Sequence, residues 1–216
     1  NSTQWKRVLD DIKFLNSWGI FDNPRYLKIY GKPVMYFYEA QAMIGEVDEM
    51  LRDVDNVRDI LWIGDLVYTL SEPDNETIQQ KKMLSYEGWS DWVGSWYIPL
   101  EDPVNYNFVI ALERAHRIWG GGAQKYGILY APTVTPGFVN LRNPMFPVLP
   151  RDGDMFQKEI EIALKYAIPS KDGKRIIFIQ TLDELGEATG IEPTREEGFL
   201  FYEVLKSTLE KYLLNP

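Results

Sequence analysis

Short runs of apolar residues alternate along this chain with segments whose apolar residues recur at helical spacing. The short runs predict buried strands and the periodic segments predict amphipathic helices. Strands joined by helices are typical of parallel α/β folds. The predicted strands are Val34–Tyr38, Ile60–Ile63, a segment within Gly88–Trp96, Tyr126–Tyr130 and Arg175–Gln180. The predicted helices are Trp5–Trp18, Glu46–Val57, Tyr106–Trp119, which Gly120 to Gly122 would stop, Met155–Ile168 and Glu197–Leu213.

Parallel strands joined in this way form either an open doubly wound sheet or a closed barrel. A barrel needs eight strands, whereas five would leave two exposed edges, which natural proteins avoid. The chain also begins with Asn-Ser-Thr-Gln and not with an initiating methionine. We therefore expect a (β/α)8 TIM barrel whose last five strand-helix units come from this single domain of 216 residues, with the first three strands missing from the front.

Composition narrows the function classes. The apolar fraction of 45% and the charged fraction of 25% are those of a soluble globular protein. A net charge of −9 argues against nucleic acid and anionic membranes as partners. No apolar run approaches the ~20 residues that a membrane span needs.

The residue types available for catalysis are also restricted. The chain has no cysteine and a single histidine, His116, so we expect no metal, no cofactor and no serine or cysteine triad. Abundant carboxylates and 14% aromatic residues suit carbohydrate, which stacks on rings and is cleaved by carboxylic acids. Glycosylation sequons at Asn1 and Asn75 favour an extracellular or cell-surface location, which the sequence otherwise leaves open.

The segment Ile176–Thr194 carries the strongest chemical signal. A buried strand runs directly into four carboxylates, and the loop after a strand lies at the ligand-binding face of parallel α/β folds. Burial and a neighbouring carboxylate both raise a carboxyl pKa, so such a pair can divide into a proton donor and an ionised base. The alternative is a capping box formed by Thr181 and Glu184 at a helix start. Gly186 and Gly190 favour a shaped loop, because glycine interrupts a helix.

This segment resembles the motif after the last strand of glycoside hydrolase family 99, the endo-α-mannosidase family, and of related polysaccharide-biosynthesis barrels. The family pattern is Asn-Glu-Trp-x-Glu-Gly-Thr-x-Ile-Glu-Pro. Here it reads Asp183-Glu184-Leu185-Gly186-Glu187-Ala188-Thr189-Gly190-Ile191-Glu192-Pro193. Asp183, Leu185 and Ala188 depart from the family's asparagine, tryptophan and glycine. Two further stretches resemble the family in the same order, namely Asn23–Val34 and Pro132–Phe138 with Asn140 and Arg142.

The resemblance implies a fold and a reaction. It places the predicted strands as the fourth to eighth of a barrel that cleaves α-mannosidic bonds with retention of configuration, acting on an oligosaccharide or polysaccharide. Glu184 would be the base that assists through the substrate's own 2-hydroxyl, and Glu187 would be the general acid/base for the leaving group. Asp183 would place a third acid beside this pair.

Further residues at strand ends are candidates for substrate binding, with core packing or surface ion pairs as the alternative. They are Tyr38, Glu39, Asp65, Asp91, Trp92, Trp96, Arg142, Asp183 and Glu192. His116, in a helix, is interpreted as structural, and Asp152-Gly153-Asp154 as a turn before a helix rather than a calcium site. Two alternatives to an enzyme remain. One is a non-catalytic carbohydrate-binding or structural barrel, and the other is one piece of a larger assembly that includes the missing N-terminal half.

Overall fold

A computed structural model describes residues 2–38, 40, 47–66, 86–91, 108–139 and 148–214. The helices in these ranges are α1 (Ser2–Ser17), α2 (Val47–Asp55), α5 (Phe108–Tyr126), α6 (Gly153–Tyr166) and α7 (Leu200–Leu214), with short 3-10 turns η1 (Ile20–Asp22) and η3 (Leu185–Glu187). The strands are β1 (Lys28–Ile29), β2 (Lys32–Phe37), β3 (Leu61–Asp65), β4 (Gly88–Ser90), β5 (Leu129–Ala131), β6 (Thr133–Val134) and β7 (Phe178–Ile179). The predicted alternation of strands and helices is confirmed.

The parallel strands follow one another in chain order. One sheet has the order β1-β2-β3-β4-β5, in which only β1 is antiparallel, and β6 pairs in parallel with β7. Only Pro132 separates β5 from β6, and its carbonyl accepts the amide of Phe178 at 2.9 Å. The two are therefore one strand that pairs first with β4 and then with β7. Among the described strands, no reversal point interrupts this order, as expected for a barrel and not for a doubly wound sheet.

The sheet is curled, and its first and last strands meet across the concave face. Tyr36 of β2 packs on Phe178 of β7 with ring centroids 4.6 Å apart. The apolar cluster on this face is drawn from the alternate, inward-pointing residues of several strands. Its members are Ile29, Val34, Leu61, Ile63, Leu129 and Ala131, with Tyr36, Ile176 and Phe178 packed against them.

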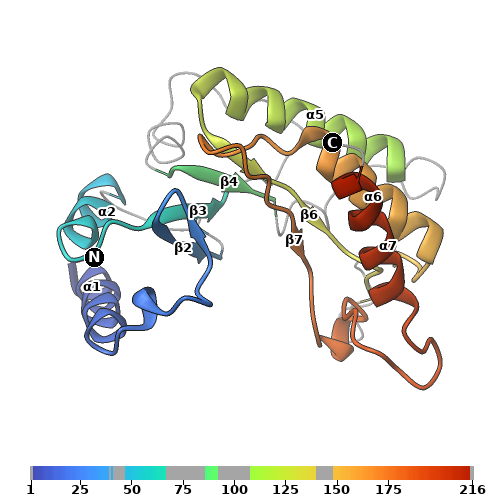
Figure 1. Cartoon of the computed structure of the whole chain (residues 1–216), viewed down its shortest axis with the longest axis horizontal. Helices are drawn as coiled ribbons and strands as arrows, with labels where there is room; N and C mark the ends of the chain where they lie inside the picture. The colour runs from blue at the N-terminus through green and yellow to red at the C-terminus, as the bar shows by residue number, and fades with distance from the viewer. Residues whose placement is uncertain are drawn as a thin grey trace.

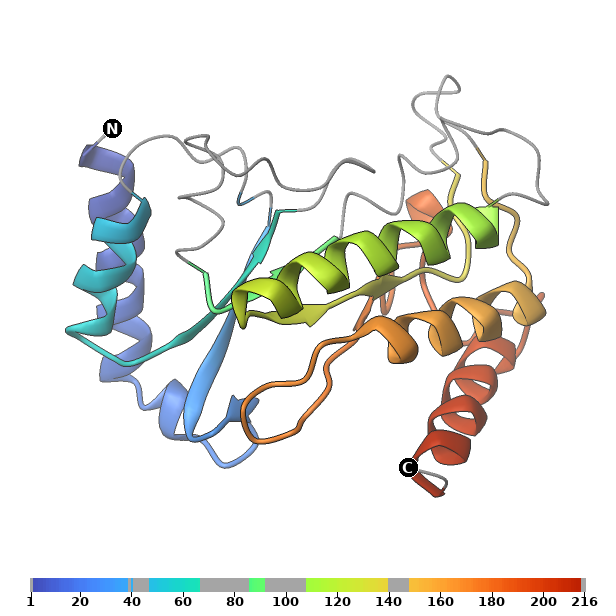
Figure 2. The same cartoon turned by 90° about the horizontal axis from the view of Figure 1, so that it is seen from above.

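Helices cover the convex face (Figure 1). The outward residues Trp62 and Trp89 share a core cluster with Met50 of α2 and Trp119 of α5, and α1 packs against the same cluster through Ile12. Trp89 is fully buried and lies 6.3 Å from Trp119, ring centre to ring centre. A second cluster joins β6 and β7 to α6 and α7. Figure 2 shows α1 with α2 at one end of the sheet and α5 to α7 at the other.

The predicted end of the α5 helix at Trp119 is wrong, since the helix continues through the three glycines to Tyr126. Gly120 is required by packing rather than by helix termination. A Cβ atom at this position would lie 2.7 Å from the carbonyl oxygen of Tyr166, at the end of α6. Glycine therefore allows α5 and α6 to approach closely.

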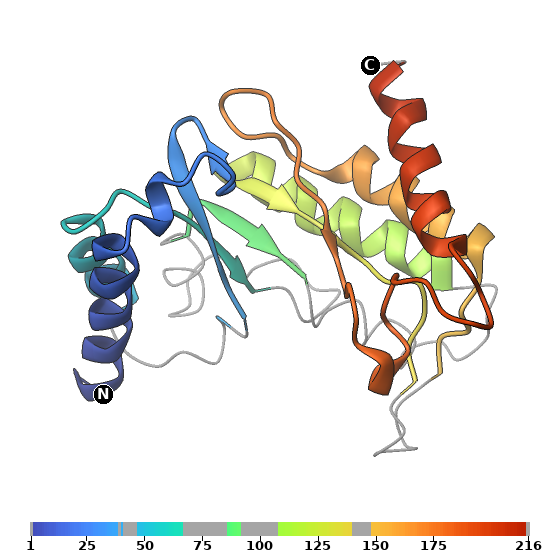
Figure 3. The same cartoon turned by 60° about the horizontal axis from the view of Figure 1, so that its bottom comes forward.

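The amino end of the curled sheet is held by a contact between distant segments. The β1–β2 hairpin turns at Tyr30 and Gly31, which both have positive φ, as a two-residue hairpin turn requires. The amide of Tyr30 donates to Asp172, in the turn between α6 and β7, at 3.1 Å. Figure 3 shows this hairpin and turn on one side of the sheet, with η3 on the opposite side. The turn that begins β2 is thus tied to the turn that precedes β7.

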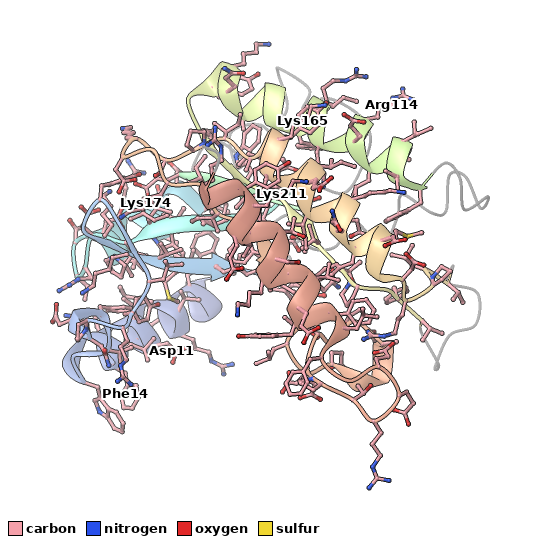
Figure 4. All side chains as sticks on the ribbon, turned by 45° about the vertical axis from the view of Figure 1, so that its right-hand side comes forward. Asp11, Phe14, Arg114, Lys165, Lys174 and Lys211 are labelled. Carbon is pink, nitrogen blue, oxygen red and sulfur yellow. The ribbon has the colours of Figure 1, made fainter. Side chains whose placement is uncertain are left out.

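Ion pairs add little to the packing of the last three helices. Lys165 of α6 lies 2.6 Å from Glu113 of α5, and Lys211 of α7 lies 3.5 Å from Glu161 of α6. Both lysines lie on the surface (Figure 4). Exposed pairs of this kind contribute little because water and salt screen them, so apolar burial holds these helices together. Asp152 caps α6 by accepting the amide of Met155, which agrees with the interpretation of this segment as a turn before a helix.

Candidate functional site

The loop that follows β7 has a defined hydrogen-bonded structure. The hydroxyl of Thr181 accepts the amide of Glu184 at 2.9 Å, and the Glu184 carboxylate accepts the amide of Gly186 at 3.1 Å. Only half of the expected capping box is therefore present. No α-helix follows, because the chain makes the single 3-10 turn η3 and bends back so that Thr189 donates to the Glu184 carbonyl. The segment after β7 is therefore a shaped loop and not the start of a helix.

Small residues make this bend possible. A Cβ at Gly186 would lie 2.9 Å from the Glu184 carboxylate, and one at Gly190 would lie 3.3 Å from the carbonyl of Leu182. Ala188 has φ of 55°, in the left-handed region that glycine adopts without steric cost. This position holds glycine in the family motif, and glycine would adopt the conformation found here without steric cost.

The two glutamates differ in exposure. Glu184 and Asp183 are exposed, whereas Glu187 and Glu192 are half-buried. Glu184 is therefore not enclosed beside the apolar strand, as the sequence had led us to expect. Its carboxylate instead lies where a molecule from solvent can reach it.

A second loop fixes the backbone at Glu187. The amide of Val139, in the segment after β6, donates to the Glu187 carbonyl at 2.9 Å. That segment is itself ordered, since the Thr135 hydroxyl donates to the Gly137 carbonyl at 2.8 Å and Phe138 pairs with Leu149. The Pro-Gly-Phe segment (Pro136 to Phe138) therefore lies beside the loop after β7 that carries Glu184 and Glu187, called the glutamate loop below. Both segments had been predicted from the sequence to belong to the site.

The other predicted site residues fall into two groups. Tyr38 follows β2 and is 50% exposed, while Asp65 at the end of β3 and Asp91 just after β4 are 0% and 2% exposed. Glu39, Trp92, Trp96 and Arg142 lie outside the described residues. The described members are thus at the carboxyl ends of neighbouring parallel strands, where ligands bind in such folds.

Polar side chains line the concave face at this end of the sheet. Ser90 and Thr133 place their hydroxyl oxygens 3.3 Å apart. Burial, followed by the nearby charge of Asp65, raises the pKa of Tyr36 above its ordinary value. Below them, the same face is filled by the apolar cluster of Val34, Leu61 and their neighbours. The change from apolar to polar residues marks the side of the sheet that is suited to a hydrophilic ligand.

Asp91 belongs to a buried network that also includes His116, the histidine predicted to be structural. His116 Nδ1 lies 2.8 Å from the Tyr130 hydroxyl and 3.4 Å from Asp91. Burial lowers the pKa of His116 to about 3 and raises the pKa of Asp91 to about 8, so the pair is neutral at pH 7 and is not an ion pair. Among the described residues, no group hydrogen-bonds His116 Nε2. Nδ1 is therefore the ring nitrogen through which His116 bonds to this network, and which group donates in the contact with Tyr130 depends on the tautomer.

Two buried carboxyl groups continue the hydrogen-bond ladder where β4 ends. Asp91 accepts the amide of Thr133 at 2.7 Å, and Glu159 of α6 accepts the amide of Thr135 at 3.0 Å. These amides point away from β7, toward the side that β4 no longer covers. Burial raises the pKa of Glu159 to about 8. Both side chains thus satisfy strand amides that would otherwise be buried without partners.

The comparisons with known proteins agree with this architecture. A structure described as a glycoside hydrolase-like protein matches with a TM-score of 0.73 and 16% identity over 93% of this chain. Two structures of the family 99 endo-alpha-mannosidase from Bacteroides thetaiotaomicron, one of them in complex with BIS-TRIS-propane, match with TM-scores of 0.64 and 0.63, at 16% and 17% identity over 98% and 95% of the chain. This chain has the fold of those proteins. No protein-family model matches the sequence, and no curated protein matches it in sequence.

The resemblance to family 99 that the motifs suggested is therefore confirmed at the level of fold. The chain spans 60% of the length of the glycoside hydrolase-like protein and 68% and 60% of the two endo-alpha-mannosidase chains. In the part of the chain that the structure describes, no group of three or more histidine, aspartate and glutamate residues is arranged to hold a metal ion. None of the described helices is both long and apolar enough to cross a bilayer.

Proposed function

We propose that this protein is a glycoside hydrolase-like barrel protein that acts on an α-linked, mannose-type glycan through Glu184 and Glu187. One observation carries the proposal. The loop with both glutamates follows the last parallel strand and is bonded to the loop after β6, and these loops lie at the carboxyl side of the sheet. The fold shared with family 99 structures supports the same interpretation.

The proposed reaction divides the work between the two carboxyl groups, as the family resemblance implies. Glu184 removes the proton of the substrate's 2-hydroxyl, whose oxygen then displaces the leaving group at the anomeric carbon. Glu187 protonates the departing oxygen and then deprotonates a water molecule that attacks the anomeric carbon. This attack breaks the bond from that carbon to O2, Glu184 returns its proton to O2, and the two inversions retain the configuration. The exposure of Glu184 and the fixed backbone of the half-buried Glu187 suit these roles.

We further propose that the complete unit is an eight-stranded barrel in which these strands are the fourth to eighth. The support is the sequential parallel order, the contact between Tyr36 and Phe178 across the concave face, and the greater length of the structural neighbours. Unpaired strand edges invite association, so polypeptide outside this sequence should cover β2 and β7. Native mass spectrometry of material from the source should show a longer chain or a bound partner. A stable monomer of these residues alone would contradict the barrel proposal.

The remaining candidates are proposed substrate contacts. Tyr38, Asp65, Asp183 and Glu192 lie on strand ends or on the glutamate loop. The Asp91 carboxyl accepts the amide of Thr133 within the protein. A contact of Asp91 with sugar therefore stays a prediction.

Direct assay of turnover tests the function. The protein should release oligosaccharides from an α-mannan substrate, and proton NMR of the first product should show the α-anomer before mutarotation. A β-anomer would exclude the retaining mechanism. A matched β-linked glucan should remain uncleaved.

The alternative, a non-catalytic carbohydrate-binding barrel, has its own signature in this assay. Asp183 and Leu185 stand where the family motif has asparagine and tryptophan, and both flank Glu184. Binding of α-mannan oligosaccharides without turnover would favour this alternative. The double change Asp183→Asn and Leu185→Trp then tests whether activity can be recovered.

A further inference from the structure

Arg151 makes an unusually complete set of contacts behind the glutamate loop. Its Nε and Nη2 donate to the two carboxylate oxygens of Glu197 at 2.7 and 2.6 Å. Nη1 donates to the carbonyl of Ala188 at 2.6 Å, and Nη2 also donates to the carbonyl of Gly190 at 3.0 Å. The guanidinium thus joins α6, which begins just after Arg151, to the loop and to the segment before α7.

The rest of the Arg151 side chain is enclosed as well. Its guanidinium carbon lies 4.3 Å from the centre of the Phe201 ring. Its Cγ would lie 2.6 Å from a Cβ placed on Gly137, so the Pro-Gly-Phe segment can pack here only with glycine at that position. The side chains of Arg151 and Glu197 are 19% and 26% exposed. Two loops therefore rest on one largely enclosed arginine.

We propose that Arg151 is a positioning residue for the Glu184 and Glu187 pair. Ala188 directly follows Glu187, so the bond to its carbonyl fixes the backbone next to that glutamate. The Val139 amide fixes the Glu187 carbonyl from the other side. Arg151 itself does not reach the reacting atoms, and the catalytic part of this inference rests on the proposed function.

The geometry requires arginine and not merely a positive charge. A guanidinium presents five N–H donors in a planar fork, which can bond both oxygens of Glu197 and two carbonyls at once. A lysine ammonium has three donors at one point and cannot span these acceptors. Arg151→Lys therefore keeps the charge and loses the geometry. Arg58→Lys is a matched control, because Arg58 is paired with Asp22 at 2.7 Å far from the loop.

Hydrogen exchange and kinetics test the proposal together. In Arg151→Lys, the amides of Thr189, Ile191 and Val139 should exchange at least about tenfold faster, while the α5 amides stay unchanged. On a substrate that the unaltered protein cleaves, kcat should fall about 10²-fold with little change in KM, because a small displacement of a catalytic group has an effect of this size. Arg58→Lys should change neither quantity. If Arg151→Lys fails to fold, Glu197→Gln is measured in its place and should show the same pattern with smaller amplitude.

The outcomes separate the positioning role from the proposed function. Unchanged exchange at the three amides would overturn the anchoring of the loop, whether or not the protein is an enzyme. Faster exchange with an unchanged kcat would overturn the catalytic positioning. If the unaltered protein cleaves no glycan, the proposed function fails, and the exchange rates alone then decide whether Arg151 holds the loop.

Discussion

Glu184→Gln and Glu187→Gln should each lower glycosidase activity by about 10²–10⁴-fold while leaving the fold intact, because an amide neither ionises nor donates an acidic proton. The stability of Glu184→Gln should stay within about 0.5 kcal/mol of that of the unaltered protein, since Glu184 is exposed and an amide oxygen can still accept the Gly186 amide. Initial rates on an α-mannan oligosaccharide and the midpoint of urea unfolding check the two statements. Glu203→Gln, on the exposed side of α7, is the control and should leave both unchanged.

The two variants should also differ from each other. A substrate with a good leaving group needs little protonation, so it should restore much of the first chemical step in Glu187→Gln but not in Glu184→Gln. A substrate without the 2-hydroxyl should not be cleaved at all, because Glu184 would have no proton to remove. Full activity in Glu187→Gln would show that the assignment of the acid is wrong.

Local sequence signals predicted the strands, the helices and the glutamate loop, because each depends on residues close together in the chain. The end of α5 was missed for the opposite reason. Gly120 interacts with the carbonyl of Tyr166, more than forty positions along the chain, and no local pattern reveals that close approach. The hydrogen bonds from Arg151 to Ala188, Gly190 and Glu197 were not predicted for the same reason, because these residues come together only in the folded chain.

Two members of the buried network lie at positions whose helical spacing indicates burial. His116 lies four residues after Leu112 and three before Trp119, on the face of α5 that is buried. Glu159 likewise lies between Phe156 and Ala163 on the buried face of α6. A polar residue at such a position must find a buried partner. The position predicts burial of each side chain, but the partners Asp91 and Thr135 emerge only from the arrangement of the strands.

Glu159 and Asp91 together should determine how stability depends on pH above neutrality, because burial raises the pKa of both carboxyl groups to about 8. For Glu159, this pKa in the folded protein lies above the ordinary 4.5 of the unfolded chain. The folded state therefore holds the proton more tightly. This contribution to stability is fully present below about pH 4.5 and is lost as the pH rises toward and through 8. Asp91 acts in the same direction, whereas His116, with its pKa lowered to about 3, has the opposite effect only below pH 6.5. Above pH 6.5 the two carboxyl groups act alone, and stability should fall.

Glu159→Gln should remove the part of this loss that Glu159 causes and leave the part that Asp91 causes. The glutamine amide is neutral at every pH, and its oxygen can accept the Thr135 amide as Glu159 does at 3.0 Å. The variant should equal the unaltered protein or be about 1 kcal/mol less stable at pH 5, because the amide adds a buried donor. At pH 9 it should be more stable by on the order of 4 kcal/mol, since each unit of pKa difference corresponds to about 1.4 kcal/mol. Urea unfolding of both proteins at pH 5 and pH 9 measures this crossing, in which the variant gains stability relative to the unaltered protein as the pH rises. Glu161→Gln, on the same helix but paired with Lys211 at the surface, should show no crossing. An equal difference between Glu159→Gln and the unaltered protein at pH 5 and pH 9 would show that Glu159 does not hold its proton in the folded state. The Thr135 amide would then donate to an ionised carboxylate. A group other than the β6 and α6 contacts described here would have to stabilise its negative charge.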